Sequence, residues 1–186
     1  MRARASDMGA CVMRNIKTPF SKSDTSSGGH DHRRCVDHAL NAAERVCAAA
    51  GARLTPLRRR VLLEVWASHD PIGAYDILRR LKGDALKAAP PTVYRALDFL
   101  MKYGLVHRLE SRNAFIGCRT PESAHAGHFL ICARCGDVAE FDDDRLDGTI
   151  SDAAARVGFA AHRAAVEIRG LCPSCQENDD ERTTAP

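Results

Sequence analysis

The chain has 186 residues, of which 45% are hydrophobic and 27% are charged, and its net charge is +3. This length suits one medium domain or two small ones, and the composition is typical of a soluble globular protein. The longest apolar runs are too short for a transmembrane helix, and the N-terminus lacks the apolar core of a secretory signal, so we expect a cytoplasmic protein.

Charge is unevenly distributed along the chain. Residues 51–110 contain 11 Lys and Arg against 6 Asp and Glu, whereas residues 111–186 contain 8 against 13. A basic segment followed by an acidic one indicates two domains with different roles. The basic segment is the better candidate for contact with a polyanion.

The N-terminal part of the chain is predicted to be a tail followed by helices. Residues 1–34 are expected to be disordered, because SKSDTSSGGHDHRR is polar and has little to bury. The first domain is expected from residue 35. Apolar residues at helical spacing then predict four helices, within the segments Asp37–Gly51, Leu54–Asp70, Gly73–Gly83 and Ala89–Leu105.

A β-hairpin is predicted after the last of these helices. Two short extended runs, Val106–Leu109 and Ala114–Cys118, flank a turn-like Ser-Arg-Asn sequence. Helices followed by a hairpin describe a winged helix-turn-helix domain over residues 35–119. Residues 120–127 are expected to form a linker.

The second domain is predicted over residues 128–176, with a flexible tail at residues 177–186. The pattern favours three strands and one helix: Phe129–Cys132, Val138–Phe141, helix Asp144–Val157, and a last strand at about Ala161–Arg169. The predicted fold class is therefore α+β, a winged helix-turn-helix domain followed by a small α/β domain.

Four cysteines in two CxxC pairs predict a structural zinc site. Cys132 and Cys135 form the first pair, and Cys172 and Cys175 follow after 36 intervening residues. Four thiolates satisfy tetrahedral zinc and leave no open position, so such a site stabilises the fold and does not catalyse. The alternative is a thiol-redox pair, but neither CxxC opens the helix of a βαβ unit.

Other soft ligands remain outside this set. One cysteine, two histidines and one carboxylate suit a second tetrahedral zinc site, and the candidates are His107, Cys118, His125 and Glu140. Each also has a structural interpretation, as a surface wing residue, a buried strand residue or a solvated strand end. His128 is either a further ligand or a polar residue at a strand start.

Several motifs together resemble a known family of repressors. LTPLRRRVLLEV, PPTVYRALDFL, HFLICARCGDVAEF and LCPSC, in this order over about residues 36–176, resemble ferric uptake regulator-type proteins, and the zinc uptake regulator branch most closely. Iron-sensing members carry a His-His-Asp-His run before the first CxxC, where this chain reads SAHAGHF. The resemblance implies a dimeric, metal-responsive repressor with an N-terminal winged helix and a C-terminal dimerisation domain.

The resemblance also implies roles for single residues. It places a regulatory zinc at His107, Cys118, His125 and Glu140 and a structural zinc at the four paired cysteines, so two Zn²⁺ ions are expected per subunit. Candidate DNA-binding residues are Tyr75, Arg95, Thr92, Tyr94 and Arg58. An arginine near the start of the last helix can read guanine, or can contact phosphate without reading sequence. The two tyrosines are equally compatible with packing.

We therefore expect a zinc-responsive repressor that binds double-stranded operator DNA as a homodimer and controls zinc uptake genes. We expect no catalysis, small-molecule substrate or membrane contact. An iron- or peroxide-sensing repressor of the same superfamily is the first alternative, and a zinc-ribbon thiol-redox protein is the second. Cys35, Cys47 and His162 receive no assigned role.

Overall fold

The computed structural model describes residues 32–68, 70–82, 89–122, 127–162 and 164–177. These residues form two compact units, one before and one after the gap at residues 123–126. The predicted C-terminal tail lies outside the described residues except for its first residue, Glu177. The predicted N-terminal tail is described only for His32–Arg34, which belong to the first turn of a helix.

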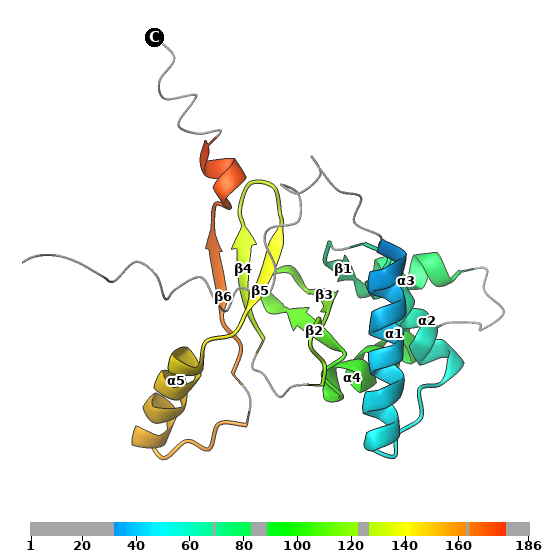
Figure 1. The fold of residues 1–186 in the computed structure, drawn as a ribbon, viewed down its shortest axis with the longest axis horizontal. Coiled ribbons are helices and arrows are strands. Elements are labelled where there is room, and N and C mark those ends of the chain that lie inside the picture. Colours follow the sequence, from blue (N-terminus) through cyan, green and yellow to red (C-terminus); the bar gives the residue numbers. More distant parts are fainter. Residues whose placement is uncertain (1–31, 69, 83–88, 123–126, 163, 178–186) are drawn as a thin grey trace, which may run out of the picture. The chain divides into compact units, whose positions relative to one another are not determined.

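Four helices form the core of the first unit (Figure 1). Their apolar faces meet in one cluster that includes Leu40, Val61, Ile77 and Leu97. The helices overlap the four segments predicted from helical spacing: α1 (His32–Ala49), α2 (Pro56–Val65), α3 (Ala74–Leu81) and α4 (Pro90–Lys102).

Local side-chain chemistry determines where α2 and α4 begin. Thr55 is the N-cap of α2, and its hydroxyl accepts a hydrogen bond from the backbone N–H of Arg58 at 3.4 Å. Proline follows at the first helical position, where its missing N–H costs nothing. At α4 the hydroxyl of Thr92 accepts from the backbone N–H of Ala89 at 2.9 Å, which is one half of a capping box.

A small antiparallel sheet completes the first unit. Its strands β1 (Ile72–Gly73), β2 (Val106–Leu109) and β3 (Ala114–Gly117) have the order β1-β3-β2. The predicted hairpin is confirmed as β2 and β3, and β1 was not predicted because two residues carry no alternating pattern. Together with the helices, this hairpin gives the unit the elements of a winged helix-turn-helix.

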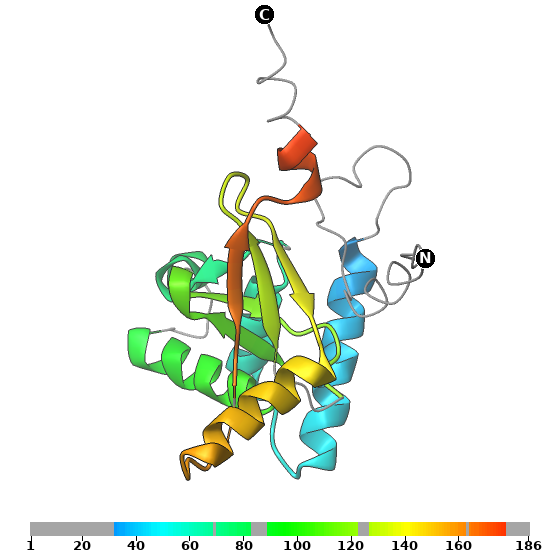
Figure 2. The ribbon, with the colours of Figure 1, turned by 90° about the vertical axis from the view of Figure 1, so that its left-hand side faces the viewer.

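The second unit is a three-stranded sheet with one helix. Its elements are β4 (His128–Cys132), β5 (Val138–Phe141), α5 (Asp144–Arg156) and β6 (Glu167–Gly170). The strand order is β5-β4-β6, with β5 antiparallel and β6 parallel to β4 (Figure 2). Helix α5 lies beyond one end of this sheet in both views. Helices and separate sheets confirm the α+β class.

The last strand is shorter than the sequence predicts. We expected it at about Ala161–Arg169, but β6 covers only Glu167–Gly170. The reason is its partner, because β4 begins at His128, and the register pairs Phe129 with Glu167. The chain before Val166 therefore has no strand beside it. No described helix is long and apolar enough to cross a membrane.

Candidate metal centres

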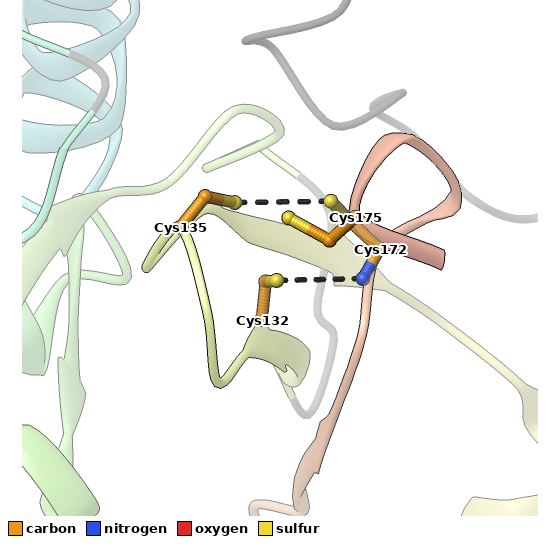
Figure 3. Close-up of side chains that lie close together, drawn as sticks. All are labelled: Cys132, Cys135, Cys172 and Cys175. Atoms are coloured by element: carbon orange, nitrogen blue, oxygen red, sulfur yellow. Dashed lines mark hydrogen bonds between the residues drawn. The ribbon is translucent and has the colours of Figure 1, made fainter. Parts of the chain in front are cut away.

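The four paired cysteines meet at one end of the sheet in the second unit. Cys132 ends β4, Cys135 lies in the following turn, and the other two follow β6. Their sulfur atoms all lie within 4.8 Å of one another and point toward a common centre (Figure 3). Four convergent thiols fit the tetrahedral ligand set of zinc and leave no position for a substrate.

Backbone geometry makes this centre suited to negative charge. The backbone N–H of Cys172 donates to the sulfur of Cys132 at 3.4 Å. Burial by itself raises the pKa of Cys132, but hydrogen bonds from the backbone of Cys172, Cys135 and Arg134 outweigh it and lower this pKa to about 6. Burial and the neighbouring sulfurs raise the pKa of Cys175 to about 12. The thiol of Cys132 is thus ionised more readily than that of Cys175.

Arg134 joins the two cysteine turns. It lies between the cysteines of the first pair, and its guanidinium Nη1 donates to the backbone carbonyl of Cys175 at 2.7 Å. The neighbouring N–H of Ala133 donates to Gly170 at the same distance. These bonds hold the two cysteine turns together. The sequence reasoning missed Arg134, because only its position between two ligands signals the role.

His107 and Cys118 form a second group of ligand atoms in the first unit. His107 pairs with Ile116 across the hairpin, and Cys118 lies two residues after Ile116. Side chains two residues apart in a strand share a face, so His107 and Cys118 are diagonal neighbours on the same face of the hairpin. Both are buried, and their ligand atoms lie within 4.8 Å of each other.

The other two predicted regulatory ligands lie outside this unit's described residues. Glu140 is a buried residue of β5 in the second unit. His107, Cys118 and Glu140 are the described members of the second predicted set of metal ligands. His125 lies outside the described residues. A thiol, an imidazole and a carboxylate are the donor types that zinc takes in proteins, so the residues present fit this metal.

Comparison with known proteins decides the family. The ferric uptake regulator family matches residues 49–169, which is more than half of the chain. The chain belongs to the ferric uptake regulator family. It is therefore a DNA-binding transcription regulator and not an enzyme, in agreement with the sequence-based expectation.

The relatives of this chain include a zinc uptake regulation protein and a peroxide-responsive repressor. The zinc uptake regulation protein of Escherichia coli (strain K12) is 40% identical over 139 residues, which are 74% of this chain and 81% of that protein. The peroxide-responsive repressor PerR of Staphylococcus saprophyticus is 28% identical over 142 residues, which are 76% of this chain and 95% of that protein.

Solved structures of family members have the same fold. A zinc uptake regulator complexed with zinc and DNA is 38% identical, with a TM-score of 0.72, and the match covers 78% of this chain and 97% of that one. The holo form of a protein named XcZur is 40% identical, with a TM-score of 0.70, over 76% of this chain and 99% of that one.

The candidate DNA-binding residues of this family member fall into two groups. Tyr75 on α3 and Tyr94 and Arg95 on α4 are exposed, and 75% of the surface of Tyr75 is open to solvent. Thr92 caps α4, and Arg58 stacks its guanidinium 3.5 Å from the centre of the Phe99 ring and donates to the carbonyl of Arg53. The first group is open to a ligand, whereas the second has internal partners.

Packing accounts for most of the remaining titratable candidates. His128 is fully buried, and its Nδ1 accepts from the backbone N–H of Val166 while its Nε2 lies 2.9 Å from Asp147. This contact was missed because its partners are 19 and 38 residues away. Cys47 is a core residue whose pKa is raised by burial. Cys35 packs beside the same core, and His162 is exposed.

Proposed function

We propose that this protein is a zinc-responsive transcriptional repressor that binds operator DNA as a homodimer when its regulatory zinc site is filled, and so controls zinc uptake genes. The observation that carries the proposal is the pair His107 and Cys118, buried together on one face of the hairpin. A repressor must reach its operator, so we place the protein in the cytoplasm.

The two ligand sets have different tasks in this proposal. The four cysteines belong to one unit and serve its stability. The regulatory set takes His107 and Cys118 from the winged-helix domain, His125 from the linker and Glu140 from the second domain. When bound there, zinc would crosslink the two domains through these ligands; this crosslink is the tie between the domains. Because the tie exists only in the loaded protein, zinc favours one arrangement of the DNA-binding domains over others.

Operator contact is assigned to the exposed residues of α3 and α4. Arg95 lies six residues into α4 and is exposed, so its guanidinium can reach the O6 and N7 atoms of guanine in the major groove. Tyr75 and Tyr94 add exposed aromatic surface. In a dimer, two such helices must match half-sites about 34–36 Å apart. Tyr75, Tyr94 and Arg95 are therefore proposed as direct contacts, and Thr92 and Arg58 as residues that hold α4.

The proposed dimer uses the second unit. Helix α5 has no buried residue, although it is 13 residues long. Large exposed apolar residues are also concentrated here, with Val157 80% exposed, Phe159 66%, Ile168 47% and Leu171 37%. An uncovered helix and apolar residues on an edge strand are typical of a surface that a second copy covers.

The decisive experiment measures operator binding against free zinc. Cys118→Ser and His107→Ala should keep one tightly bound zinc per subunit and remain folded dimers. Because the tie is lost, their operator affinity should be low at every zinc concentration, whereas the unmodified protein should bind more tightly by a factor of about 5–150 when zinc fills the site. Gel-shift titrations with metal analysis of the same samples give both quantities.

Arg95→Ala is the matched control for this experiment. It should keep both zinc ions and the dimer, yet lose about 1–3 kcal/mol of operator binding. An unchanged zinc response in Cys118→Ser would refute the regulatory site. Tighter binding with ferrous iron than with zinc would instead favour the iron- or peroxide-sensing alternative, to which the 28% identity with a peroxide-responsive repressor also points.

A further inference from the structure

Trp66 lies directly against the backbone of the hairpin that carries His107 and Cys118. It is the single tryptophan of the chain, follows the end of α2, and is only 8% exposed. A Cβ atom built on Gly117 would meet the indole Cε2 and Nε1 at 2.3 Å and Cζ2 at 2.7 Å. A residue larger than glycine does not fit at position 117, because the indole occupies the space of its side chain.

The two faces of the hairpin carry different side chains near Gly117. Val106 and Phe115 belong to the helical core together with Trp66. Val106 pairs with Gly117 and Phe115 lies two residues before it, so all three face the core. Cys118 is the next residue, and it faces the opposite side together with His107. A displacement of β3 on its core face thus moves the Cys118 sulfur on the other face relative to His107 on β2.

We propose that Trp66 is a positioning residue for the regulatory metal site, because its indole ring sets the position of β3 and hence of the Cys118 sulfur. This inference rests on the proposed function. The same contact makes the indole a reporter of that site. A metal that fixes the position of Cys118 also affects β3, and β3 touches the indole ring.

The distances show why the contact matters for metal binding. Ordinary van der Waals contact begins at 3.4 Å, so a methyl group at position 117 requires β3 and the indole to separate by about 1 Å. Ligand distances in metal sites are held to about 0.2 Å. The separation is thus several times larger than a zinc site tolerates, and it acts on a residue adjacent to a ligand.

A double-mutant cycle on zinc affinity tests the inference. Gly117→Ala should weaken the second zinc site by about 10–100-fold, as loss of an outer-shell support does, while the four-cysteine zinc stays bound. In a Trp66→Leu background the smaller side chain leaves room for the methyl group, so Gly117→Ala should there have little further effect. Gly73→Ala is the control, because a Cβ at Gly73 in the same unit meets only the Asp76 Oδ2 at 3.5 Å, an ordinary van der Waals contact.

Fluorescence of the unmodified protein gives an independent measurement. Its tryptophan emission should change in step with occupancy of the second zinc site, and Cys118→Ser should abolish the change. This test remains available even if Gly117→Ala does not fold.

Two outcomes would overturn the inference. One is an equal loss of zinc affinity from Gly117→Ala in both backgrounds, and the other is tryptophan emission that does not change when the second zinc binds. Either result, with Cys118→Ser still losing that zinc, would leave the proposed function intact. Retention of both zinc ions by Cys118→Ser would instead overturn the proposed function itself.

Discussion

The cysteines of the candidate zinc site have different environments, although all four are the same residue type. Cys132 receives backbone N–H donors and has a pKa of about 6, whereas burial raises the pKa values of Cys172 and Cys175. Burial is the largest cause for Cys172 and Cys175, and contact with the sulfurs of Cys132 and Cys135 raises both pKa values further. Cys132 is therefore the ligand that is ready to bind metal at neutral pH.

This asymmetry predicts how zinc binding depends on pH. Cys172 and Cys175 are protonated at neutral pH and must each lose a proton to zinc, so two or more protons should be released per ion. Acid returns these protons, and the zinc affinity of the centre should therefore fall as pH falls from about 8 to about 6.5. Calorimetry in buffers of different ionisation enthalpy counts the protons.

The Cys118→Ser variant is the right sample for this titration, since only the four-cysteine centre then binds zinc. Release of one proton or fewer would show that the cluster is already ionised in the metal-free protein, against the raised pKa values.

At the scale of the element, the start of α2 depends on one hydroxyl group. Thr55 accepts the hydrogen bond of a backbone N–H that has no partner inside the helix. The helix then runs into the core with Val61, Leu62 and Val65, and ends beside Trp66. Its first turn therefore sets the position of a residue that contacts the hairpin.

Thr55→Ala should lower the free energy of unfolding of the first unit by about 1 kcal/mol, within a range of about 0.5–2 kcal/mol. The loss follows because the N–H of Arg58 has no acceptor in the variant. Denaturant titration followed by Trp66 emission measures it, as this tryptophan lies in the same unit. Thr55→Ser keeps the hydroxyl and should unfold like the unmodified protein, so a loss of similar size in Thr55→Ser would argue against the cap.

At the scale of the whole molecule, four large apolar residues of the second unit are exposed, namely Val157, Phe159, Ile168 and Leu171. Phe159 and Val157 follow α5 and are more than half exposed. Such residues rarely remain open to water in a contiguous group. The homodimer proposed above removes them from water and gives each operator half-site one winged helix.

Phe159→Asp should therefore shift the protein from dimer to monomer, because the interface would bury an unpaired charge. Sedimentation equilibrium measures the change, and metal analysis should still find the structural zinc. Tyr75→Asp is the matched control, since it makes the same kind of change at an exposed aromatic residue of the first unit. A dimer of unchanged affinity in Phe159→Asp would place the interface elsewhere.

The sequence by itself determined the element types, the cysteine centre and the family. Helical spacing located α1 to α4, and two CxxC pairs identified four candidate ligands, because periodicity and short motifs are local properties of the chain. The resemblance supplied His107 and Cys118 as ligands, which spacing alone left open.

Only the tertiary structure decided the contacts between distant segments. The burial of His128 against Asp147, the bond from Arg134 to Cys175 and the short extent of β6 depend on which segments pack together. The same holds for the contact between Trp66 and Gly117, which are 51 positions apart in the sequence. The indole of Trp66 fills the space that a side chain at position 117 would occupy. No local pattern encodes such pairs, because the packing of the whole unit selects them.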